Sequence, residues 1–194
     1  MKSLSIAVIS AVALLVAGAS SASAAPQYWL SKNKTAPSTH CYAGYGYVDL
    51  SQVFPVDATS ATFTGGARMA CTQPFPAGAQ LAAGSGTMDL WFTNTNRKSC
   101  TTTWWLYNNA TATHAGDIVT GVYYGGPAIY VPANTTTPTK FTINFWVPDR
   151  TLLPDDQLQL HVNVRTASGS CSNMTLYYGS TLHPSNISLP TLVG

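Results

Sequence analysis

The chain has few residues that could perform acid–base or nucleophilic chemistry. All seven acidic residues are aspartates, and no glutamate occurs. A glycosidase needs two carboxylates that flank the scissile bond, but Asp149, Asp155 and Asp156 lie in one turn-rich segment. A serine hydrolase of the nucleophile-elbow type needs a Gly-x-Ser-x-Gly motif, which the sequence lacks. We therefore expect no enzymatic activity and no catalytic residues.

The four histidines are scattered along the chain, at His40, His114, His161 and His183. Zinc and copper sites usually show a recognisable ligand spacing, which these positions do not have. Asp155 and Asp156 offer the oxygen ligands that calcium prefers, although a simple Pro-Asp-Asp turn is the more common explanation for such residues. We predict no metal site and no cofactor, with bound calcium left open.

Aromatic residues are better candidates for a functional site than the aspartates or the histidines. The candidates for contact with a ligand or another subunit are Trp91, Trp105, Tyr107 and Trp146. Their sequence neighbours are assigned to the core, so period-two alternation points these four side chains outward. Exposed aromatic rings stack on sugars or form hot spots between subunits. The alternative is that they pack under a loop or pair across neighbouring strands.

Five Asn-x-Ser/Thr sequons are candidates for N-glycosylation. They lie at Asn33, Asn109, Asn134, Asn173 and Asn186. Occupied sequons would supply solubility that the few charges do not, and their occupation depends on the host.

The elements that must position these residues are predicted to be strands. Apolar and polar residues alternate in Thr87–Thr93, Phe141–Val147 and Leu158–Val164. Less regular strand candidates are Gln27–Ser31, Tyr47–Phe54, Ala61–Thr64, Thr101–Tyr107, Ile118–Tyr124 and Met174–Gly179. Turns rich in Gly, Pro and Asn separate them. The pattern predicts an all-β fold, a single antiparallel β-sandwich over residues 25–194.

The N-terminal segment has the features of an export signal. Lys2 precedes the apolar run Ile6–Val16, and Ala22-Ser23-Ala24 resembles a cleavage site. The alternative is a membrane anchor, but the run is short for a span. We expect residues 1–24 to be a cleaved signal peptide and the product to be secreted, free or at the cell surface.

Because an exported protein reaches an oxidising compartment, we expect the four cysteines to form disulfides. Cys41, Cys71, Cys100 and Cys171 form no Cys-x-x-Cys pair, and three pairings are possible. We favour Cys100 with Cys171, because each precedes an apolar-aromatic strand candidate, which leaves Cys41 with Cys71.

Charge excludes several classes of protein. Charged residues make up 8% of the chain and the net charge is +2, against about 25% charged residues in typical soluble domains. Such a chain lacks the basic surface of a nucleic-acid-binding protein and the charge of a disordered tail.

The C-terminal third resembles a group of secreted prokaryotic domains. Leu153-Pro154-Asp155-Asp156-Gln157-Leu158-Gln159-Leu160 is followed by Leu176-Tyr177-Tyr178-Gly179, Pro184-Ser185-Asn186-Ile187 and Leu189-Pro190. This is similar to the ending of jelly-roll-like β-sandwich domains of surfaces and appendages, which have glycine where this chain has Asp155. The resemblance implies an extracellular β-sandwich in adhesive or appendage contexts, without catalytic residues.

These observations favour a non-enzymatic extracellular structural or adhesive protein, a self-assembling subunit of a surface filament or layer held by β-strand pairing. Gln27, Tyr28, Trp29 and Leu30 form the candidate donor strand, although they can also pair within their own sheet. Expected partners are copies of the chain or other surface proteins, with polysaccharide as an option. The alternative is a secreted carbohydrate-binding module that uses the outward aromatic residues.

Overall fold

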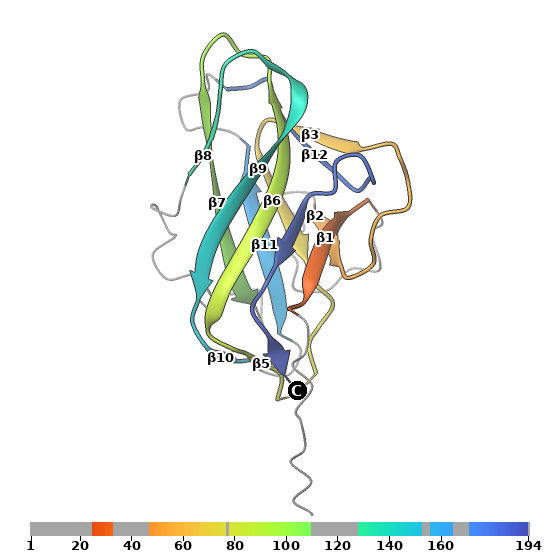
Figure 1. The fold of residues 1–194 in the computed structure, drawn as a ribbon, viewed down its shortest axis with the longest axis vertical. Coiled ribbons are helices and arrows are strands. Elements are labelled where there is room, and N and C mark those ends of the chain that lie inside the picture. Colours follow the sequence, from red (N-terminus) through yellow and green to blue (C-terminus); the bar gives the residue numbers. More distant parts are fainter. Residues whose placement is uncertain are drawn as a thin grey trace, which may run out of the picture.

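The fold is all-β, as predicted (Figure 1). The computed structural model describes residues 25–32, 47–76, 78–109, 128–152, 156–164 and 171–193. The strands are β1 (Gln27–Ser31), β2 (Tyr47–Ser51), β3 (Ala61–Thr64), β4 (Ala67–Cys71), β5 (Gln80–Leu81), β6 (Gly84–Asn94), β7 (Cys100–Asn109), β8 (Ile129–Val131), β9 (Thr135–Val147), β10 (Arg150–Thr151), β11 (Gln157–Asn163), β12 (Met174–Tyr178), β13 (Asn186–Ser188) and β14 (Leu192–Val193). Within these ranges no helix has the length and apolarity needed to cross a membrane.

Eleven strands belong to one sheet. The order is β3-β12-β6-β13-β1-β2-β4-β11-β7-β8, with β9 paired to β6 beside this path. Every described strand pair is antiparallel except β2 with β4. A smaller sheet has the order β10-β5-β14. Strands from both ends of the sequence therefore meet in the middle of the large sheet.

The pair β6–β9 is the longest, and Figure 1 shows the two strands running side by side. Met88, Leu90 and Phe92 of β6 are fully buried, and Ile143 and Phe145 of β9 are buried too. Their neighbours along each strand are more exposed. The alternation read from the sequence is confirmed for this pair.

Strand β11 departs from the predicted pattern because both of its faces are buried. Leu158, Leu160 and Val162 point into the core as expected, but Gln159 and His161 are only 1% and 7% exposed. Trp105 of the neighbouring β7 lies against the His161 ring, with centroids 3.8 Å apart. The predicted single buried face is therefore wrong here, since aromatic side chains help to cover the second face.

Other differences concern strand ends and short strands. The predicted strand Tyr47–Phe54 ends at Ser51, where the Val53 N–H donates a hydrogen bond to the Ser51 hydroxyl. The short strands β4, β5, β8, β10, β13 and β14 were not predicted. Predicted strand Ile118–Tyr124 lies outside the described residues.

A disulfide joins Cys100, at the start of β7, to Cys171, just before β12, as predicted. Cys71 is also disulfide-bonded, and its partner lies outside the described residues. Cys41 and residues 1–24 also lie outside them, so the Cys41–Cys71 pairing and the signal peptide stay predictions.

Candidate functional site

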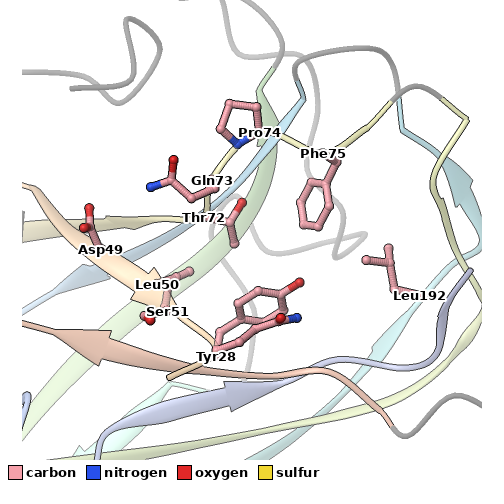
Figure 2. A pocket seen from close by; sticks show the side chains of 10 residues that line it. Tyr28, Asp49, Leu50, Ser51, Thr72, Gln73, Pro74, Phe75 and Leu192 are labelled. Atoms are coloured by element: carbon pink, nitrogen blue, oxygen red, sulfur yellow. The ribbon is translucent and has the colours of Figure 1, made fainter. Parts of the chain in front are cut away.

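A pocket of about 330 Å³ opens beside β1 and β2 (Figure 2). Its lining residues are Tyr28, Asp49, Leu50, Ser51, Gln52, Thr72, Gln73, Pro74, Phe75 and Leu192. They come from β1, from β2 and the residue after it, from the segment that follows β4, and from β14. Figure 2 shows Asp49 and Gln73 on one side and Phe75 and Leu192 on the other. The pocket thus has a polar end and an apolar end.

The segment after β4 is fixed by hydrogen bonds to β11 and the residue before it. The Thr72 N–H donates to the Leu158 carbonyl, and the Leu158 N–H donates to the Thr72 hydroxyl. The Gln157 side-chain amide donates to the Thr72 carbonyl, and the Phe75 N–H donates to the Asp156 carbonyl. This wall of the pocket is therefore preformed.

Two polar groups in the lining are buried. Tyr28 is 4% exposed and Asp49 is 6% exposed. Burial raises the pKa of the Tyr28 phenol above its usual value, although a hydrogen bond with the Gln52 side chain lowers it in part. The phenol therefore stays protonated at neutral pH and can donate a hydrogen bond. Asp49 is the sole carboxylate among the described lining residues.

A second polar cluster joins Ser60 to two residues, Ser180 and His183, that lie far along the sequence from it. The Ser60 Oγ lies 2.6 Å from the His183 Nδ1 and 2.8 Å from the Ser180 Oγ. The His183 backbone N–H donates to the Ser180 Oγ over 3.0 Å. Ser60 precedes β3, while Ser180 and His183 lie in the turn between β12 and β13.

Aromatic rings hold the imidazole of this cluster. The rings of Trp91 and Tyr177 lie 5.2 and 5.3 Å from the His183 ring, centroid to centroid. The Ser185 hydroxyl donates to the Tyr177 carbonyl and accepts from the Trp91 backbone N–H, which ties the turn to β6 and β12. Burial lowers the pKa of His183 below its usual value. The ring is therefore uncharged at neutral pH and can accept a proton.

The predicted aromatic site residues do not share one environment. Trp146 is 61% exposed, whereas Trp91 and Trp105 are half-buried against His183 and His161. Tyr107 belongs to β7, and its side chain lies outside the described part of the structure. Of the described side chains that alternation predicted to point outward, Trp146 is exposed, and contacts with histidines partly cover Trp91 and Trp105.

The candidate donor strand is paired on both sides within the chain. Gln27, Tyr28 and Trp29 face β13, and Trp29, Leu30 and Ser31 face β2. Both edges of β1 are therefore occupied, and Tyr28 and Leu30 are buried in the core.

Three of the predicted sequons lie at described side chains. Asn134 and Asn173 are exposed in turns, whereas Asn186 is buried, accepts a hydrogen bond from Gln27 and donates one to the Pro184 carbonyl. Asn33 and the Asn109 side chain are not described. Among the described residues, no group of three or more His, Cys, Asp or Glu side chains gathers as metal ligands would.

Comparison with known proteins links this fold to hydrolases. No family model and no curated protein matches the sequence. The chain is similar in structure to an α-amino acid ester hydrolase (TM-score 0.55, 12% identity, 86% of this chain) and to a CocE/NonD family hydrolase from Staphylococcus aureus (0.53, 7%, 87%). It is also similar to an aminopeptidase from a marine sediment Thaumarchaeota archaeon (0.51, 9%, 84%). The chain spans 36% of the length of each of these structures.

These likenesses contradict the functional predictions. The prediction of a non-enzymatic structural or adhesive protein is wrong, because the proteins that share the fold are hydrolases. The predicted filament formation and self-assembly and the carbohydrate-binding alternative are wrong for the same reason. The prediction of no enzymatic role is overturned by the same finding. It rested on the lack of local motifs, but residues can also be brought together from distant segments.

The sequence places Tyr28 only in the candidate donor strand and His183 only among scattered histidines, and it gives no sign of Ser60. Ser60 and His183 are 123 positions apart, so no local spacing connects them. Asp49 did carry a signal, because it stands between Val48 and Leu50 in a strand candidate, and aspartate is depleted in strands. A buried aspartate in a strand indicates a specific role for its carboxylate.

Proposed function

We propose that the chain is a β-domain that takes part in the hydrolysis of ester or peptide bonds. It binds the α-aminoacyl group of the substrate in the pocket at Tyr28 and Asp49. Two of the hydrolases with a similar fold are named for amino acid esters and for aminopeptidase activity. Substrates of both kinds carry a free α-amino group. A fold alone does not imply a function, so the proposal depends on the pocket.

The observation that supports it most is the buried carboxylate of Asp49 in a pocket of about 330 Å³. This volume is at the lower end for small-molecule sites and suits one amino-acid-sized group. An ammonium group paired with a buried carboxylate forms a charge-assisted hydrogen bond. The Tyr28 phenol can donate to a carbonyl oxygen, and Phe75 and Leu192 offer apolar surface to a side chain.

The proposed architecture is a two-layer, jelly-roll-like sandwich. Trp104 of β7 packs against Phe145 of β9, with ring centroids 5.0 Å apart, and the Cys100–Cys171 disulfide ties β7 to the start of β12. Both contacts join strands that are distant along the sheet path, which supports two facing layers. We also propose export, since a disulfide suits an oxidising compartment.

Binding of phenylalaninamide, measured by calorimetry or NMR titration, tests the proposed function. N-acetylphenylalaninamide is the matched ligand without the ammonium group. We expect phenylalaninamide to bind and the acetylated compound to bind at least about tenfold more weakly, because a hydrogen bond to a charged group contributes roughly 1.5–3 kcal/mol.

Asp49→Asn should weaken phenylalaninamide binding by a similar factor. The matched control is Asp57→Asn, which removes an exposed aspartate that pairs with Lys32 on the surface and should leave binding unchanged. Equal binding of the two ligands, or full affinity in Asp49→Asn, would refute the proposal.

A further inference from the structure

The cluster of Ser60, Ser180 and His183 has the geometry of an activated serine. Nucleophile and base in such pairs lie about 2.6–3.2 Å apart, and the Ser60 Oγ is 2.6 Å from the His183 Nδ1. We infer that Ser60 is a nucleophile and His183 its general base, and that the pair transfers acyl groups from esters to water. This activity goes beyond the proposed binding function and does not rest on the Asp49 pocket.

The hydrogen bonds of the cluster are consistent with this assignment. With its proton on Nε2, the His183 ring accepts at Nδ1 from the Ser60 hydroxyl. Ser60 can then accept from the Ser180 hydroxyl, which itself accepts from the His183 backbone N–H. The Ser60 proton is thereby directed at the imidazole, and Ser180 holds the Ser60 oxygen in place.

The environment of the pair also suits this reaction. Ser60 and His183 are half-buried, so part of each side chain is accessible to a small acyl compound. Trp91 and Tyr177 fix the plane of the imidazole. The lowered pKa of His183 keeps the ring in the basic form at neutral pH.

The proposed reaction has two balanced steps. The Ser60 Oγ attacks the ester carbonyl carbon while its proton moves to the His183 Nδ1, and the ester bond breaks as the leaving alkoxide takes that proton. Water then attacks the acyl-serine, gives one proton to His183, and releases the carboxylic acid as the Ser60 Oγ recovers its proton. No metal, oxidant or other co-reactant is consumed.

The cluster has an alternative role in fixing the turn between β12 and β13. The His183 N–H to Ser180 bond already closes that turn locally, whereas Ser60 joins from 123 positions away. The two roles differ in one observable property: a serine that only stabilises the turn does not react with acylating or phosphonylating agents faster than any other serine.

Covalent labelling of the folded protein with a fluorophosphonate, read by intact mass and peptide mapping, tests the inference. We expect a single adduct at Ser60 and its loss in Ser60→Ala. His183→Gln should slow labelling by about 100-fold, because a general base contributes roughly 10²–10⁴-fold. The wild-type protein should also release 4-nitrophenol from 4-nitrophenyl acetate with a burst of about one equivalent.

Ser85→Ala is the matched control, because Ser85 is exposed on β6. This variant should be labelled, and should hydrolyse 4-nitrophenyl acetate, as the wild type does. Thermal unfolding of each variant shows whether reactivity is lost because the protein no longer folds. If Ser60→Ala unfolds the turn, Ser60→Cys tests the site instead. No adduct on folded wild-type protein, an adduct at another serine, or unchanged labelling in His183→Gln would overturn the inference. None of these outcomes affects phenylalaninamide binding at Asp49.

Discussion

Protonation of His183 would affect the packing of three strands. Its ring lies against Trp91 of β6 and Tyr177 of β12, and its Nδ1 contacts Ser60 beside β3. Protonation would convert Nδ1 from an acceptor into a donor and would place a charge between two aromatic rings. Because burial lowers the pKa of His183, the folded protein favours the neutral ring more than the unfolded chain does.

The stability of the protein should therefore depend on His183 at mildly acidic pH. The folded-state pKa lies below the unfolded value, so the unfolded chain binds more protons, and the free energy of unfolding falls as pH drops from about 6.5 through the folded-state pKa. Urea unfolding between pH 7.5 and 4.5 measures this. His183→Gln should show a smaller decrease over that range than the wild type, and equal slopes would contradict the expectation.

Strand β6 carries a close approach that only glycine permits. A Cβ on Gly86 would lie 2.5 Å from the Phe145 ring and 3.0 Å from the Ser188 carbonyl oxygen. Gly86 thus lets β9 and the residues at β13 pack against β6 at the point where three strands meet.

Gly86→Ala should lower the free energy of unfolding by about 1–3 kcal/mol, the usual effect of overpacking. Urea unfolding followed by tryptophan fluorescence measures it. In a Phe145→Leu background the additional loss should be smaller, because the ring that the methyl group meets is gone. An equal loss in both backgrounds would show that the conflict is with the backbone and not with Phe145.

Sequence predicted the elements where one face is buried and the other is exposed. Strand β6 shows this, with Met88, Leu90 and Phe92 inward, and the β9 residues from Phe141 to Val147 alternate in the same way. β11 could not be predicted in full, because burial of His161 depends on Trp105 from another strand. β13 has three residues, too few for any periodicity, and exists because β1 and β6 both pair with it.

The Cys100–Cys171 bridge links strands that are far apart in the sheet order. It closes a loop of 71 positions between β7, next to the last strand at one end of the sheet path, and the turn that leads into β12, next to the last strand at the other end. The bridge therefore restrains the unfolded chain and holds two distant parts of the fold together.

Replacing both Cys100 and Cys171 by alanine should lower the free energy of unfolding by about 4 kcal/mol, the value the chain-entropy model gives for a loop of this length. Equilibrium unfolding in urea measures it, with Cys71 left intact so that its own disulfide is unchanged. A loss below about 1 kcal/mol would mean that the unfolded chain keeps these cysteines close without the bond.

The candidate sites could be predicted less well than the strands, for a reason that lies in the topology. The pocket takes Tyr28 from β1, Asp49 from β2, Phe75 from the segment after β4 and Leu192 from β14. Apart from Asp49, none of these residues stands out by its type or spacing within its own segment. Only the sheet order brings these segments together, and strand order across distant segments is not encoded in alternation.

The position of β1 has a consequence for the timing of folding. Gln27 hydrogen-bonds to Asn186, 159 positions later, so one side of the first strand finds its partner only when nearly all of the described chain exists. At typical synthesis rates this wait is on the order of ten seconds. During that interval β1 and β6 lack β13 and present open edges, which are the features most prone to pairing with foreign strands. Completion of the sheet must therefore wait until β13 has been made, and we expect closure of such distant pairs to be slow.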